Sequence, residues 1–186
     1  MTDPHELPEN LPVPEDDGAC LHLPGRDLPD LELSSTAGRR VHLRDVSRGL
    51  AVFFFYPRSG RPGVPIPAAW DQTPGARGCT PRSCAYRDHH AEFRRLGATV
   101  FGVSSQDSAY QLELVSRNQL PYEILSDAEF LLTDALHLPT FEFEGVRLIK
   151  RLTLVVEKAR IKKVFYPVFP PNQNAEVVLA WLEGRT

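Results

Sequence analysis

The chain has 186 residues, a formal net charge of −3, 42% hydrophobic residues and 24% charged residues. This length suits a single domain that buries a core without disulfides or metals. The charge excludes a nucleic-acid binder that relies on bulk electrostatics, and three cysteines exclude a disulfide-built secreted scaffold. The 17 prolines exceed ordinary usage and predict a compact domain with long irregular loops.

The N-terminus shows no basic stretch followed by an apolar run, so we do not expect it to act as a signal peptide. The longest apolar run, residues 50–56, is far shorter than the roughly 20 residues of a membrane-spanning helix. We therefore expect no membrane partner and a cytoplasmic location, where cysteines are thiols unless chemistry makes them otherwise.

The chain divides into a leader and a domain. Residues 1–30 contain six prolines, eight acidic residues and one basic residue. Such a composition is typical of an extended segment that lies on a domain or projects from it. We predict a proline-rich acidic leader over residues 1–27 and one domain over residues 28–186.

Within the domain, alternating residues at 31–33 and 41–43 flank Gly38 and predict an N-terminal hairpin. Residues 51–56 are apolar on both faces and predict a central strand, and residues 57–81 predict a long ordered loop. The remaining expected elements are helices at 79–96, 107–118, 127–137 and 174–182, and strands at 99–103, 152–156 and 163–166. This order predicts an α/β three-layer sandwich with a mixed central sheet.

Cys79 stands out chemically. Thr80-Pro81 is a helix-start signal, with Thr80 as the expected N-cap, so Cys79 lies just before the helix or in its first turn. A helix N-terminus carries about half a positive charge. Four arginines and one aspartate in residues 57–82 add a local charge of 4 − 1 = +3. Both effects favour the nucleophilic thiolate.

Cys84 follows five residues later. On one helix the two residues are about 140° apart around the axis, and their Cα atoms are roughly 8–9 Å apart, beyond disulfide reach. The pair can bond only if the helix start unwinds. Two unconnected cysteines, or a zinc site with His89 and His90 that lacks a recognised spacing, are the alternatives. Cys20 has no visible partner.

Several segments resemble the peroxiredoxins, in particular the bacterioferritin comigratory or Q-type subgroup. The resemblance spans about residues 28–184, and the element Gly78-Cys79-Thr80 with Cys84 is its most specific part when joined to a downstream arginine-containing strand. The other matching segments are residues 28–31, 54–57, 73–75, 87–88, 101–104, 120–127 and 150–155.

This resemblance implies a thioredoxin-like fold and assigns roles to single residues. Cys79 resembles the peroxidatic cysteine, Cys84 the resolving cysteine, and Arg151 the arginine that activates the thiolate and binds the peroxide. The family has a hydroxyl residue three positions before the peroxidatic cysteine, where this chain has Ala76. The resemblance leaves Thr73, Thr80 or backbone amides as the groups that would bind the peroxide.

We therefore expect a thiol-dependent peroxidase that reduces hydrogen peroxide and organic hydroperoxides, forms an intramolecular disulfide and is recycled by a thioredoxin-type protein. No metal or organic cofactor is implied, and a monomer is expected. Two alternatives remain. One is a thiol–disulfide oxidoreductase on the same fold, whose usual mark is Cys-x-x-Cys rather than Cys-x4-Cys. The other is a non-enzymatic Cys/His metal-binding module.

Overall fold

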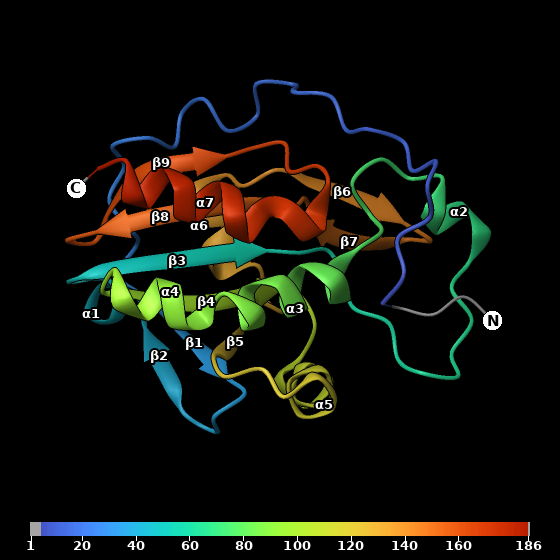
Figure 1. Cartoon of the computed structure of the whole chain (residues 1–186), viewed down its shortest axis with the longest axis horizontal. Coiled ribbons are helices and arrows are strands. Elements are labelled where there is room, and N and C mark those ends of the chain that lie inside the picture. Colours follow the sequence, from blue (N-terminus) through green and yellow to red (C-terminus); the bar gives the residue numbers. More distant parts are fainter. Residues whose placement is uncertain (1–4, 186) are drawn as a thin grey trace.

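The computed structural model describes residues 5–185 and contains a seven-stranded mixed sheet in the order β2-β1-β5-β4-β3-β8-β9 (Figure 1). Central strand β3 pairs parallel to β4 and antiparallel to β8. Strands β6 and β7 form a separate antiparallel hairpin. The strands are β1 (Glu32–Ser35), β2 (Arg40–His42), β3 (Leu50–Phe55), β4 (Ala98–Ser104), β5 (Glu123–Ser126), β6 (Thr140–Phe143), β7 (Val146–Ile149), β8 (Leu152–Glu157) and β9 (Arg160–Phe165).

Helices cover both faces of the large sheet, which makes the three-layer α/β sandwich that the sequence predicts. Side chains of α1 (Leu43–Val46) and α6 (Leu131–Leu136) enter the core on one face. The opposite core receives side chains from α3 (Cys79–Asp88), α4 (His90–Arg95), α5 (Ser108–Asn118) and α7 (Asn174–Glu183). The short helices α2 (Ala68–Asp71) and η1 (Pro171–Gln173) lie in connecting segments.

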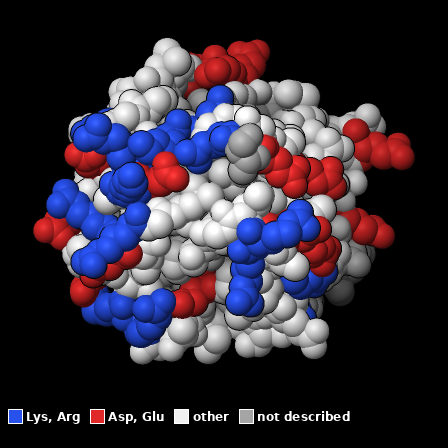
Figure 2. Space-filling view, turned by 60° about the vertical axis from the view of Figure 1, so that its left-hand side comes forward, with Lys and Arg blue, Asp and Glu red and all other residues white. Residues whose placement is uncertain are grey.

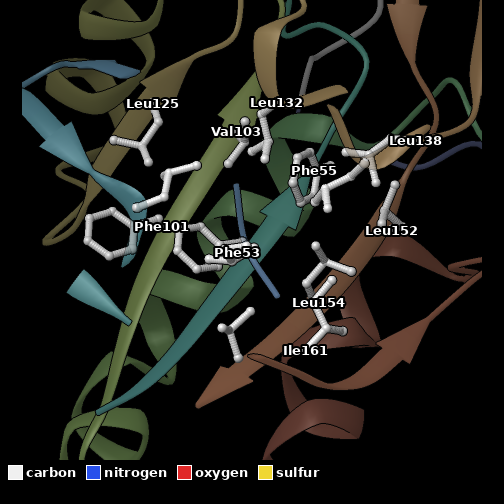
Figure 3. Close-up of a cluster of buried hydrophobic side chains, with 14 of the residues drawn as sticks. Phe53, Phe55, Phe101, Val103, Leu125, Leu132, Leu138, Leu152, Leu154 and Ile161 are labelled. Atoms are coloured by element: carbon white, nitrogen blue, oxygen red, sulfur yellow. The ribbon is translucent and has the colours of Figure 1, made fainter. Parts of the chain in front are cut away.

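Strand β3 is buried on both faces because its side chains alternate between two apolar cores. Phe53 and Phe55 point into one core, where Phe53 stacks on Phe101 with 5.4 Å between ring centroids (Figure 3). Phe54 points into the other core and stacks on Tyr86 of α3 at 4.3 Å. The prediction of a central, doubly covered strand is confirmed, and this strand fixes the position of α3.

Several details differ from the sequence-based expectation, among them the short helices α1 and α2, which were not expected. The helix expected over residues 79–96 is broken at His89, where α3 ends and α4 begins. Gly78, rather than Thr80, occupies the N-cap position of α3. Strand β5 and the β6–β7 hairpin were not expected. The break is invisible in the pattern because buried Phe93 continues the apolar face across it.

The described part of the leader, residues 5–27, lies against the domain (Figure 1). Asp17 pairs with Lys150 at 2.7 Å and accepts a hydrogen bond of 2.8 Å from the Tyr166 hydroxyl. Cys20 and Leu23 are buried in the core beside α6. Residues 1–4 lie outside the described residues, and the boundary at residue 27 stays a prediction.

The surface carries both signs of charge. Figure 2 shows one face, on which Lys and Arg groups are interrupted by Asp and Glu groups and by uncharged residues. Within residues 5–185, the helices are all too short or too polar to cross a bilayer.

Gly102 of β4 tests how tightly the core around Phe54 is packed. A Cβ atom at this position would lie 3.0 Å from the Phe54 ring and 3.3 Å from Ile124. Gly102→Ala should lower the free energy of unfolding by about 1–3 kcal/mol, the usual effect of an overpacked core, measured by urea denaturation. The matched control is Gly49→Ala, because nothing lies within 4 Å of the added methyl there. Equal stability of the two variants would contradict this packing.

Candidate active site

Cys79 is the first residue of α3, and Gly78 brings the chain into the helix. Gly78 has φ = 100°, in the left-handed region, and a Cβ atom there would overlap Pro171 of η1 and approach Leu7 of the leader. Only glycine fits this position. Among the residues that the structure describes, no side chain caps the helix, and Pro81 has no amide hydrogen. Within that part of the chain, the amides of Cys79 and Thr80 are therefore free donors at the helix start.

Arg151 lies directly before β8 and contacts the cysteine. Its Nη2 donates to Cys79 Sγ at 3.2 Å and to the carbonyls of Ala76 and Arg77 at 3.1 Å each. Its Nε donates to the carbonyl of Gly75 at 3.3 Å. Arg151 and Cys79 are only 3% and 4% exposed. The guanidinium thus places a buried positive charge next to the sulfur and also binds the carbonyls of residues 75–77.

A groove of about 360 Å³ opens beside this contact and reaches Arg151. Among residues 5–185, the buried Nη1 of Arg151 has no hydrogen-bond partner. One wall of the groove comes from the leader and the others from the loop before Cys79 and the segment after β9. Its lining includes Val13, Pro14, Gly75, Lys150, Tyr166 and Val168. Arg151 thus both lines the groove and carries a buried donor without a partner among residues 5–185.

The long loop before Cys79 is held by an aromatic cluster. Trp70 of α2 packs edge-on against Phe143 of the β6–β7 hairpin, with 4.9 Å between ring centroids. The Arg58 guanidinium lies 4.4 Å from the Trp70 ring and 5.0 Å from the Phe143 ring. The loop is therefore docked on a hairpin that sequence analysis missed.

The four arginines that make up the local charge of +3 lie in different surroundings, and their joint effect on Cys79 stays a prediction. Arg58 stacks on Trp70, Arg61 lies 3.9 Å from the centre of the Tyr110 ring, and Arg77 faces Asp71 at 3.4 Å. Arg82 is fully buried in α3, and Arg77, two residues before Cys79, is 4% exposed.

The two predicted hydroxyl donors occupy different surroundings. Thr73 donates its hydroxyl hydrogen to the carbonyl of Ala69 at 2.8 Å, yet it lines a small cavity shared with Arg151. Thr80 is buried in the first turn of α3, and its hydroxyl makes no hydrogen bond within the described part of the chain. Ala76 is fully buried, and its carbonyl lies 3.7 Å from Cys79 Sγ. A peroxide-binding role for Thr73 or Thr80 stays a prediction.

Cys84 lies on the same intact helix as Cys79, and both are free thiols. The geometric expectation that they share one helix is confirmed. Cys84 Sγ lies 3.6 Å from Asn118 Oδ1 of α5. Partial burial raises the pKa of the Cys84 thiol, which keeps it protonated at neutral pH.

A buried polar network that the sequence did not predict lies around Arg82, three residues after Cys79. Arg82, fully buried, donates to the carbonyls of Phe55 and Leu152 and to Thr153 Oγ1. Both Nε and Nη2 of Arg82 also donate to Asn174 Oδ1, at 3.2 and 2.8 Å. The only signal in the sequence is an arginine near the helix start, and such an arginine is just as compatible with an exposed position.

The alternative of a zinc site involves Cys79, Cys84, His89 and His90. Within residues 5–185, no three His, Cys, Asp or Glu side chains gather closely enough to hold a metal ion.

Comparison with known proteins identifies the family. The model of the AhpC/TSA family matches residues 24–164, about three quarters of the chain. The chain belongs to this family. It is 31% identical over 161 residues to the chloroplastic peroxiredoxin Q of Arabidopsis thaliana, a match that covers 86% of this chain and 67% of that protein. The predicted resemblance to Q-type peroxiredoxins is confirmed.

A second relative and a solved structure agree. Peroxiredoxin Bcp of Bacillus subtilis is 33% identical over 111 residues, covering 60% of this chain and 61% of its own length. The crystal structure of peroxidoxin BcpB from Mycobacterium tuberculosis superposes with a TM-score of 0.72 at 25% identity, covering 89% of this chain and 99% of that one. The fold is thioredoxin-like, and the chain is a thiol-dependent peroxidase.

Arg151→Met should lower both the reactivity of the Cys79 sulfur and the stability of the fold. Alkylation of Cys79 by iodoacetamide below pH 7 should slow, because the thiolate loses its contacting cation. The unfolding free energy should fall by about 1–3 kcal/mol, because buried carbonyls lose their donor. Peptide mapping and urea denaturation measure the two effects. Arg40→Met is the matched control, since Arg40 of β2 forms an exposed ion pair with Glu32 of β1. If Cys79 in Arg151→Met were alkylated at the wild-type rate, Arg151 would not be the group that activates Cys79.

Proposed function

We propose that Cys79 is the peroxidatic nucleophile and that hydrogen peroxide and organic hydroperoxides are its substrates. The observation that carries this proposal is the buried contact of 3.2 Å between Arg151 Nη2 and Cys79 Sγ at the start of α3. A guanidinium and a helix N-terminus both stabilise negative charge. The same donors stabilise the charge that develops on the leaving oxygen.

In the first step, the Cys79 thiolate attacks the terminal oxygen of R–O–O–H, and the oxygen–oxygen bond breaks. Cys79 becomes the sulfenic acid Cys–S–OH, and the released RO⁻ takes a proton from water to give the alcohol, or water when R is hydrogen. Sulfur loses two electrons and the peroxide gains them. The available Arg151 Nη1 and the free amides of Cys79 and Thr80 are the donors beside the reacting oxygens.

In the second step, the Cys84 thiol attacks the sulfenic sulfur, a disulfide forms and water leaves. The intact helix forbids this bond, so α3 must unwind locally. Arg82 and the carbonyl of Ser83, which accepts a hydrogen bond of 2.7 Å from the Tyr122 hydroxyl, are anchored in the core. We therefore place the movement in residues 75–81, so that Cys79 moves toward a nearly stationary Cys84.

A thioredoxin-type dithiol then reduces the disulfide by thiol–disulfide exchange, which returns both cysteines to thiols and leaves the reductant oxidised. The relatives named peroxiredoxin Q and Bcp support this assignment to the two-cysteine class. A monomeric state and a cytoplasmic location stay predictions from the sequence.

Single cysteine variants test the proposal in a coupled assay with thioredoxin, its reductase and hydrogen peroxide. Cys79→Ser should lose peroxide turnover to the background rate. Cys84→Ser should reduce about one equivalent of peroxide per chain and then stop, leaving Cys79 open to over-oxidation. Cys20→Ala is the control with normal turnover, because burial raises the pKa of Cys20 to about 12 and keeps it a thiol. Near-normal turnover of Cys79→Ser would refute the proposal, and peroxide-independent disulfide exchange would favour an oxidoreductase.

A further inference from the structure

Arg82 is a buried cation whose hydrogen-bond acceptors are all neutral. Its donors reach two backbone carbonyls, the hydroxyl of Thr153 and the amide oxygen of Asn174. No carboxylate of residues 5–185 pairs with it. A buried charge without a counter-charge is costly, by several kcal/mol in general. The site therefore contains a positive charge that its hydrogen bonds do not neutralise.

The position of Arg82 relative to Cys79 gives this charge a counterpart. The two residues are at i and i + 3 of α3, where side chains share a helix face and Cβ atoms are about 5–6 Å apart. Burial lowers the pKa of Arg82 to about 9, while the ionised Cys79 acts in the opposite direction. Arg82 is still protonated at neutral pH, and the Cys79 thiolate is the anion that the site can offer it.

We propose that Arg82 is a second cation that favours the thiolate of Cys79, acting through its uncompensated buried charge rather than by contact. This inference rests on the proposed role of Cys79 and makes Arg82 a positioning residue. Arg151 contacts the sulfur from the segment before β8, and Arg82 acts from within α3. Asn174 is part of this arrangement, because its neutral amide binds Arg82 without cancelling the charge.

The test separates the charge of Arg82 from its hydrogen bonds. Asn174 Oδ1 accepts bonds from Arg82, Tyr86 and Thr153, so Asn174→Asp keeps an acceptor in place and supplies a counter-charge. A carboxylate at the first residue of α7 also suits a helix N-terminus. Gln173→Glu is the matched control, because it adds the same charge one residue away on an exposed side chain. Arg82→Lys keeps the charge and loses several of the bonds.

The readout is the rate of Cys79 alkylation by iodoacetamide from pH 5 to pH 9, with folding checked by circular dichroism. For Asn174→Asp, the ratio of the alkylation rate at pH 6 to that at pH 9 should fall by about fivefold or more. The new carboxylate compensates the charge of Arg82, so that Arg82 no longer favours ionisation of Cys79. Gln173→Glu and Arg82→Lys should keep the wild-type ratio. Two results would overturn the inference: a wild-type ratio of alkylation rates in folded Asn174→Asp, or a lower ratio in Arg82→Lys alone. Either result would show that only the hydrogen bonds of Arg82 matter. Because alkylation needs no peroxide, this failure is distinct from a failure of the peroxidase mechanism.

Discussion

The contact between the Arg151 guanidinium and the Cys79 sulfur is the interaction on which the site depends. Arg151 enters from the segment between β7 and β8, and its remaining bonds hold the carbonyls of residues 75–77. One buried side chain therefore joins the sheet, the long loop and the start of α3. The conformation of Gly78 then directs the chain into the helix, so that Cys79 stands at its N-terminus.

Burial of positive charge destabilises the folded chain, but it also favours the thiolate form of Cys79. Both Arg151 and Arg82 are nearly or fully buried beside a single ionisable thiol. In the proposed mechanism, the Cys79 thiolate balances this charge, whereas the neutral sulfenic acid that peroxide forms from it does not. Oxidation should therefore weaken the packing around the helix start at the moment when Cys79 must move. The anchors at Arg82 and Ser83 confine that movement to the residues before them.

Much of the fold follows from local patterns in the sequence. The doubly apolar run of β3, the alternation around Gly38 and the strand pair β8–β9 are predictable, because side-chain period and turn residues determine them. Cys79 and Cys84 are recognisable from their motif and from the helix-start signal. The β6–β7 hairpin was not predicted although Gly145 marks its turn, because buried and exposed side chains do not alternate along its two strands.

Burial of arginine is the part that the sequence conceals. The sequence does not distinguish the four arginines of residues 57–82, yet the structure places them in different surroundings. Arg58 and Arg61 lie on aromatic rings, Arg77 faces an aspartate, and Arg82 is buried in the core. The acceptors of Arg82 come from Phe55, Leu152 and Asn174, which are far apart in the chain. No local pattern brings such residues together, so the network becomes visible only in three dimensions.

The central claim is that Cys79 reacts first and then joins Cys84 across a locally unwound helix. The most direct measurement is to treat the fully reduced chain with one equivalent of hydrogen peroxide, block the remaining thiols and map the peptides by mass spectrometry. The account predicts one intramolecular disulfide, between Cys79 and Cys84, with Cys20 still a thiol. A disulfide that includes Cys20, or a Cys79 that remains a free thiol while peroxide is consumed, would contradict it.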